Sequence, residues 1–168
     1  MAIRPAARVG AVLVLASLVL ITLVSPTVAA SGTAVRGGGV VDGAQGTTSQ
    51  LGFTATSSGG SFLCVMAGRS GGFPFGSWQS VQQMHVQGRV SPGSLSVAGG
   101  VATFRGIATI HVIGIAASGE FAVTLTDVPF ISTQAAGGAG VAWHLLDVPG
   151  IGAFGPAKLK TGRITIWP

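Results

Sequence analysis

Apolar and polar residues alternate with a period of two along much of the chain after residue 30. In residues 82–90, Met84 and Val86 share one face, whereas His85 and Gln87 lie on the other. Such alternation is typical of a β-strand that is buried on one side. Gly-rich segments separate the alternating stretches, and no stretch keeps a helical spacing. The pattern predicts about nine short strands, over residues 34–41, 49–56, 61–68, 82–90, 94–99, 101–112, 119–128, 141–148 and 162–167.

The alternation also predicts which residues face the core. It places Phe104 and Ile110 inward, and in the next strand it places Phe121, Val123 and Leu125 inward. Some apolar residues are instead expected on the outer face: Ile107, Ala122, Ala142, Leu146 and Trp167. Exposed apolar residues that gather in a patch mark interfaces, ligand grooves or membranes.

In residues 141–148, Val141, Trp143 and Leu145 are expected inward, which places His144 on the outer face. No catalytic or metal role is expected for that histidine.

Glycine and proline add local expectations. Gly88 and Gly106 fall at inward positions and are expected to mark bulges or tight bends of a strongly curved sheet. The tripeptide Asp-Val-Pro occurs at residues 127–129 and again at residues 147–149. Each copy is expected to end a strand, because proline cannot donate a hydrogen bond to a ladder.

Together these features predict an all-β fold, a single antiparallel barrel or sandwich of about nine short strands. The pattern leaves barrel and sandwich both open. A length of 168 residues suits one domain of ordinary size. We assign residues 31–168 to a single β-rich domain.

Residues 1–30 have the order of a secretory signal peptide. Arg4 and Arg8 precede an apolar run over residues 9–24, and small or β-branched residues lead to Ala30. Cleavage is expected near Ala30, which would make the protein secreted or associated with the cell envelope, with no integral membrane span afterwards. A retained membrane anchor is the alternative.

Composition and charge exclude several classes of protein. Only 8% of the residues are charged, too few to keep a chain with 48% hydrophobic residues disordered. The formal net charge is +5, but the basic residues are scattered except for Lys158, Lys160 and Arg163. Nucleic-acid-binding proteins usually cluster basic residues with aromatic ones between them, so no nucleic-acid partner is expected.

Cys64 is the one cysteine of the chain, which excludes an intramolecular disulfide. It alternates with Phe62 and Met66. We therefore expect it to be a small buried hydrophobe rather than a reactive thiol.

Two motifs occur without the surroundings that their chemistry needs. Residues 68–72 fit G-x-S-x-G with Ser70 as nucleophile, but the glycines and prolines that follow cannot begin the required helix. Residues 150–155 fit G-x-G-x-x-G, but Pro156 follows where a dinucleotide-binding fold needs a helix. A turn before the last strand is the better interpretation of the second motif.

The three histidines also give no site. His85, His111 and His144 fall on three separate predicted strands, all on the outer face. Three converging histidines would be needed for a catalytic zinc. A glycosidase would need two close carboxylates, and the strand-end positions of the acidic residues disfavour such a pair. We expect no catalytic residue, no metal and no cofactor.

Residues 70–78 combine glycines with three large aromatic residues, Phe73, Phe75 and Trp78. One interpretation is a loop that folds over one end of the barrel as a lid on the core. The other is that the three residues form the rim of a binding site for a hydrophobic ligand or partner.

Four segments follow one another in the chain: GGGVVD at residues 37–42, VQGRV at residues 86–90, VAGGVATFRG at residues 97–106 and FAVTLTD at residues 121–127. Their order resembles that of the secreted actinobacterial β-domains known as post-COAP domains. The resemblance implies a small exported β-domain. It implies no established activity and therefore no catalytic residue.

The first functional hypothesis is an exported, non-enzymatic domain with a structural, adhesive or partner-binding role, self-association included. The second is a barrel that carries an apolar small molecule, with Phe73, Phe75 and Trp78 at its mouth. A barrel-type enzyme would need His85, His111 or Asp42 in a cavity. An outer-membrane barrel would carry girdles of aromatic residues, which the absence of tyrosine disfavours.

Overall fold

The computed structural model describes residues 32–43, 47–68 and 72–167. The predicted signal peptide (residues 1–30) and Ser70 lie outside the described residues. The described residues form eleven strands: β1 (Ala34–Asp42), β2 (Thr47–Thr56), β3 (Gly59–Gly68), β4 (Phe73–Phe75), β5 (Trp78–Val90), β6 (Ser96–Ala98), β7 (Val101–Ala116), β8 (Gly119–Ala135), β9 (Gly137–Gly138), β10 (Trp143–Val148) and β11 (Gly152–Trp167). This part of the chain contains no helix that could cross a membrane.

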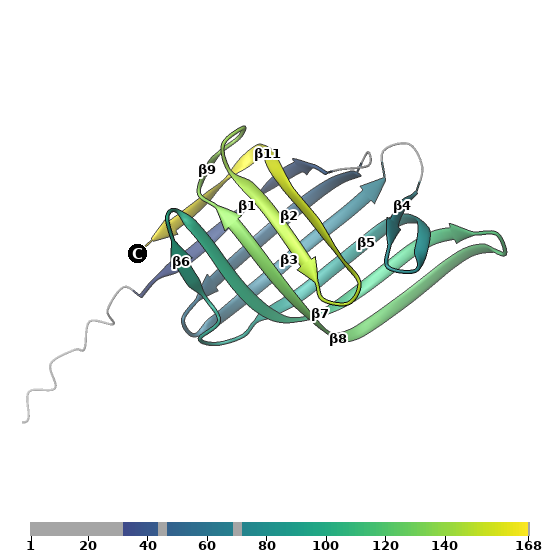
Figure 1. Cartoon of the computed structure of the whole chain (residues 1–168), viewed down its shortest axis with the longest axis horizontal. Coiled ribbons are helices and arrows are strands. Elements are labelled where there is room, and N and C mark those ends of the chain that lie inside the picture. Colours follow the sequence, from purple (N-terminus) through teal and green to yellow (C-terminus); the bar gives the residue numbers. More distant parts are fainter. Residues whose placement is uncertain (1–31, 44–46, 69–71, 168) are drawn as a thin grey trace, which may run out of the picture.

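Eight of these strands form a closed antiparallel barrel (Figure 1). In the series β1, β2, β3, β5, β7, β8, β10 and β11, each strand pairs with the next, and β11 pairs with β1 to close the ring. The short strands β4, β6 and β9 are added to β5, β7 and β11. The predicted all-β fold is confirmed, and of the two open architectures the barrel is the one observed.

The inner faces of β5 and β7 follow the predicted alternation. Met84, Val86, Phe104 and Ile110 are buried, and each is separated from the next inward residue by one outward residue. On the outer face, Ile107 is 46% exposed. Apolar residues on one side and polar residues on the other were enough to determine the orientation of these two strands.

The inner face of β10 is opposite to the one predicted. His144 and Leu146 are buried, whereas Trp143 and Leu145 are partly exposed. Both faces of this strand carry large apolar residues, so alternation alone does not choose between them. The orientation of β10 depends on the neighbouring strand β8, because the buried Gln134 of β8 is the register partner of His144.

The ends of the segment 141–148 also differ from the prediction. Ala142, expected on the outer face, is buried, and Val141, expected inside, is 68% exposed. Both residues precede β10 and lie where the chain turns after β9. Ala142 is in phase with the buried His144 and Leu146, so the whole segment 141–148 has the face opposite to the predicted one toward the core.

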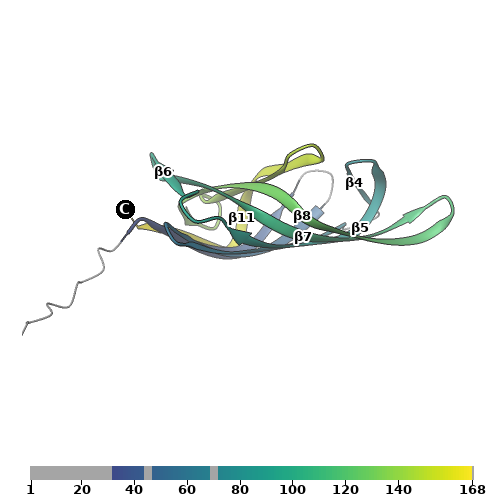
Figure 2. The same ribbon diagram turned by 90° about the horizontal axis from the view of Figure 1, so that it is seen from below.

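Strand β8 does not end at residues 127–129, which corrects the prediction. Asp127 has a positive φ of 55°, and the register with β7 shifts at this point, which marks a β-bulge. Pro129 is tolerated because β10 pairs only with residues 131–135 of β8. Before the bulge, the β7–β8 hairpin extends beyond the rest of the barrel (Figure 1, Figure 2). The second Asp-Val-Pro, residues 147–149, ends β10 as predicted.

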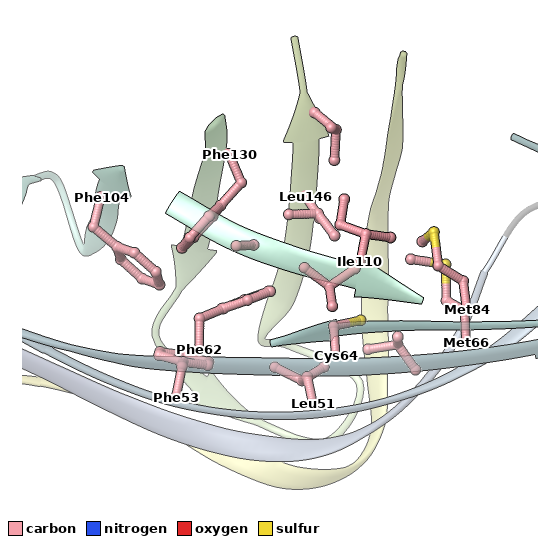
Figure 3. Packing of buried hydrophobic residues seen from close by; sticks show 14 of the residues in the cluster. Leu51, Phe53, Phe62, Cys64, Met66, Met84, Phe104, Ile110, Phe130 and Leu146 are labelled. Atoms are coloured by element: carbon pink, nitrogen blue, oxygen red, sulfur yellow. The ribbon is translucent and has the colours of Figure 1, made fainter. Parts of the chain in front are cut away.

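Aromatic residues fill one part of the barrel interior. The ring of Phe62 stacks on that of Phe130, with centroids 5.0 Å apart, and Phe104 packs edge-on against both. Figure 3 shows these rings together with Phe53 on one side of the cluster, away from Met66 and Met84.

Gly88 and Gly106 make room for an aromatic ring instead of marking bulges, because the strand register is continuous at both. A Cβ atom on Gly88 would lie 2.5 Å from Cε1 of Phe130. A Cβ atom on Gly106 would lie 2.6 Å from the same atom and would also collide with the carbonyl oxygen of Arg89. Both glycines therefore permit the close approach of Phe130 to the sheet.

Strands β1 and β11 form the seam of the barrel, where the first and last strands meet. Gly39 and Gly162 are register partners across the seam. Both have positive φ angles, 155° and 95°, and a Cβ on either would collide with a backbone carbonyl of the opposite strand. The close approach of the two backbones therefore requires glycine at both positions.

Candidate ligand cavity at one end of the barrel

A cavity of about 300 Å³ lies at one end of the barrel. Its walls come from the adjacent ends of β1, β2 and β3, from β4, from β10 and from the first part of β11. Met66, Phe73, Phe75 and Phe154 give it apolar side chains, while polar and apolar groups contribute comparable shares of the lining surface. Such a volume is at the lower end of the range of small-ligand pockets, about 300–1,000 Å³.

Strand β4 covers this end of the barrel. Phe73 and Phe75 are only 1% and 2% exposed. Phe75 stacks on Phe154 of β11 with ring centroids 5.5 Å apart, and Phe73 packs edge-on against the same ring at 6.4 Å. The segment therefore closes over the core, and its three residues also line the cavity.

The three predicted rim residues do not share one environment. Phe73 and Phe75 line the cavity, whereas Trp78 does not. The partly buried Trp78 ring stacks on Phe75 at 5.7 Å and on Phe121 of β8 at 6.4 Å. Trp78 therefore packs against β4 without lining the cavity. The role of the three residues in ligand binding stays a prediction.

Three polar residues, Thr47, Ser49 and His144, lie among the lining residues. All three are buried. Since a buried polar group is costly unless it is hydrogen-bonded, their partners decide what the cavity can bind.

His144 belongs to a buried hydrogen-bond network. The amide nitrogen Nε2 of Gln134 lies 2.7 Å from His144 Nδ1 and donates to Ser132 Oγ, also at 2.7 Å. The Ser132 hydroxyl donates to the carbonyl oxygen of Leu145 at 3.3 Å. The imidazole also stacks on Phe62, with centroids 6.0 Å apart. Gln134 thus contacts the edge of the imidazole ring, and Phe62 packs against its face.

The other ring nitrogen of His144 has no such partner. Nε2 is buried and makes no hydrogen bond to any of the described residues, and neither does the Oε1 atom of Gln134. Burial lowers the pKa of His144 from 6.5 to about 4. The imidazole is therefore neutral at physiological pH.

Cys64 is fully buried, as predicted. Burial raises the pKa of its thiol to about 12, and a hydrogen bond with Ser49 opposes this shift in part. Since the thiolate is the reactive form, Cys64 behaves as a core residue.

The remaining histidines and Asp42 are not among the residues that line the cavity. His85 and His111 are register partners on the outer face, and His111 Nδ1 lies 2.9 Å from the hydroxyl of Thr124. His144 is inside the barrel, so the prediction that it lies on the outer face is wrong. Asp42 is exposed and forms an ion pair with Lys160 at 3.6 Å. The three residues named for the enzyme hypothesis, His85, His111 and Asp42, do not line the cavity.

The described residues contain no group of three or more His, Cys, Asp or Glu side chains that could hold a metal ion. The glycine motif at residues 150–155 forms the turn after β10 and the start of β11. No helix follows it.

The network could hardly be predicted from the sequence. Phe130, Ser132 and Gln134 alternate with outward residues, which is a strand signal. The preceding Asp-Val-Pro predicts a strand end at residues 127–129. For this reason the alternation at residues 130–134 was not interpreted as part of a strand.

The fold and cavity define a class: a closed antiparallel β-barrel in which consecutive barrel strands pair and one end holds a small cavity lined by both apolar and polar groups. Comparison with protein-family models, with curated proteins and with solved structures gave no significant match. The resemblance to post-COAP domains stays a prediction.

Proposed function

We propose that the protein binds and carries one small, largely apolar molecule in the cavity at the end of the barrel. A closed eight-stranded barrel has an interior that side chains either fill or leave free for one small ligand. Here the phenylalanine cluster fills one part, and the cavity of about 300 Å³ occupies the end beneath β4. The predicted signal peptide (residues 1–30) supports a place of action outside the cytoplasm.

The observation that carries the proposal is the cavity of about 300 Å³ itself, which lies beneath β4. The aromatic side chains of β4 and β11 would contact the apolar part of a bound molecule. The buried Thr47 and Ser49 add polar groups to the same lining.

Filling the cavity should abolish binding. Ala157 lines the cavity and is the register partner of His144, so the Ala157→Leu side chain would occupy the space beside the imidazole. We expect the wild type to bind the neutral fluorophore N-phenyl-1-naphthylamine saturably, and Ala157→Leu to bind it at least about tenfold more weakly. Fluorescence titration measures both affinities.

A matched control is Ala122→Leu, which adds the same groups at an exposed position of β8. It should bind the fluorophore as the wild type does. Absence of saturable binding to the wild type, or equal weakening by both substitutions, would contradict the proposal.

A second candidate function, an interaction module, is favoured by the outer face of β3, β5 and β7. Leu63 and Ile107 are each 46% exposed and line a groove that also contains Arg89 and Asp127. One cation and one anion beside apolar residues form a surface that is self-complementary across a twofold axis.

This second candidate predicts a concentration-dependent dimer. We expect sedimentation equilibrium to show a mass increase with concentration for the wild type, and the double variant Leu63→Ser, Ile107→Ser to stay monomeric. A wild type that stays monomeric over the whole range would count against the surface as a self-association site.

A further inference from the structure

An open hollow of about 400 Å³ lies on the outer face of the barrel at the seam between β1 and β11. Its lining includes Arg36, Thr54, Arg163 and Thr165, with Gly38 between them. The register places Arg36 between Thr54 of β2 and Thr165 of β11, and it places Arg163 opposite Gly38. No described residue lines both this hollow and the cavity beneath β4. The two are therefore separate sites.

Two glycines keep the surface beside the arginines free of side chains. Gly38 and Gly52 are register partners in β1 and β2. Gly52 faces outward, since Leu51 and Phe53 on either side of it are buried in the core. A Cβ atom on Gly52 would meet no neighbouring atom within 4 Å. This part of the outer face is thus open to a ligand.

The hollow is positively charged. Arg36 and Arg163 are diagonal neighbours on adjacent strands, which places their Cβ atoms about 7–8 Å apart, within reach of one another's long side chains. Among the described residues, no Asp or Glu lines the hollow. Asp42 of β1 forms an ion pair with Lys160 instead. Since two like charges at this spacing repel, an anion between the guanidinium groups would stabilise the arrangement.

The side chain of Arg36 is positioned by an aromatic ring. Its guanidinium carbon lies over the ring of Trp167, 5.0 Å from the centroid. Such stacking restricts the side chain and leaves the N–H groups in the guanidinium plane free to donate. The forked donors of arginine match the oxygens of a phosphate group. The hydroxyls of Thr54 and Thr165 add two further donors to the lining.

We infer that the hollow binds a doubly charged phosphate group, either as inorganic phosphate or as the terminal group of a phosphate monoester. Two guanidinium groups balance two negative charges, whereas a carboxylate or a phosphodiester supplies one. The open side of the hollow leaves room for the remainder of an ester. This inference does not depend on the proposed carrier function.

The test compares three anions as probes: inorganic phosphate, methyl phosphate and dimethyl phosphate. Titration at pH 7.5 and low ionic strength, where screening is weak, is followed by the ¹⁵N shifts of the arginine side chains. We expect a Kd of about 1 mM or tighter for the doubly charged probes. Dimethyl phosphate, which carries one charge, should bind at least about tenfold more weakly.

Replacing either arginine should weaken binding. Arg36→Gln and Arg163→Gln each remove a charge-assisted donor, so we expect a loss of at least about tenfold in affinity for inorganic phosphate. Arg105→Gln is the matched control, because it removes the same charge at an exposed position of β7. It should bind phosphate as the wild type does.

A second pair of variants tests the charge of the hollow without removing an arginine. Gly52→Asp would place a carboxylate beside Gly38 and should abolish phosphate binding. Gly52→Asn has nearly the same size and no charge, so it should keep most of the affinity. The free space around the Cβ position makes both substitutions compatible with the fold.

The outcomes also identify the source of the phosphate. Equal affinities for inorganic and methyl phosphate would identify a site for terminal phosphate groups, and binding of inorganic phosphate alone would identify a site for the free ion. No saturable binding to the wild type, equal weakening by Arg105→Gln and Arg163→Gln, or equal binding of dimethyl phosphate would each overturn the inference. None of these results bears on fluorophore binding in the cavity, so the carrier function is tested separately.

Discussion

Lowering the pH from 7 to 4 should reduce the free energy of unfolding by about 3 kcal/mol through His144 alone. Its pKa is about 4 in the folded protein and 6.5 when unperturbed, and each unit of difference corresponds to about 1.4 kcal/mol. Between these two values the unfolded chain binds the proton and the folded protein does not. Acid therefore favours unfolding. The loss begins as the pH falls through 6.5 and is nearly complete at the folded pKa.

Urea unfolding at a series of pH values measures this effect. The control is His144→Phe, which removes the titrating group, so its stability should change less over the same interval. His111→Phe, which removes an exposed histidine, should keep the wild-type dependence. A wild-type stability that is constant from pH 6.5 to 4.5 would show that the imidazole is not held neutral by burial.

Replacing Gly88 with alanine should destabilise the protein by about 2 kcal/mol, within the range of about 1–3 kcal/mol for overpacked cores. The new Cβ would lie 2.5 Å from Cε1 of Phe130, and its next nearest contacts are with other atoms of the same ring. Phe130→Leu should therefore relieve the clash. In a double-mutant cycle the two substitutions together should cost at least about 1 kcal/mol less than their sum.

Gly106→Ala is the matched control. Its Cβ would also meet the Phe130 ring, but it would collide first with the carbonyl oxygen of Arg89, which is backbone. Phe130→Leu should not rescue it. Additive costs in both cycles would mean that Phe130 does not determine the need for glycine at Gly88. Chemical denaturation of the wild type, the three single variants and the two double variants gives the required free energies.

The sequence predicted best where one face of a strand is apolar and the other polar. Met84, Val86, Phe104 and Ile110 were placed inside correctly for this reason. The all-β class followed from the same alternation. The choice of a barrel over a sandwich did not, because it depends on the pairing of β1 with β11, which local patterns do not encode.

Prediction failed where local signals were ambiguous. Trp143 and Leu145 are as apolar as Leu146, so the orientation of β10 depended on the neighbouring strand. Pro129 lies within β8 because its missing donor faces no strand partner. Whether a proline ends a strand thus depends on pairing that comes from distant residues.

The candidate site was partly accessible from the sequence. The aromatic residues Phe73 and Phe75 were singled out, and they line the cavity. His144 was placed on the wrong face, and Gln134 and Ser132 were not considered. Their role arises from contact between β8 and β10, whose orientation the sequence pattern had left undetermined.

The seam between β1 and β11 also has a consequence for the order of folding. The other pairings of the barrel join strands that are consecutive in the chain or separated by one short strand, whereas Ala34 pairs with Trp167. Loop-closure entropy grows with the length of chain enclosed, and contacts between distant residues form slowly. We therefore expect the meander of strands to assemble first and the seam to close last. Since Val41 and Ala157 line the cavity from β1 and β11, the binding site is complete only after closure, and a ligand would stabilise the closed ring over any open sheet.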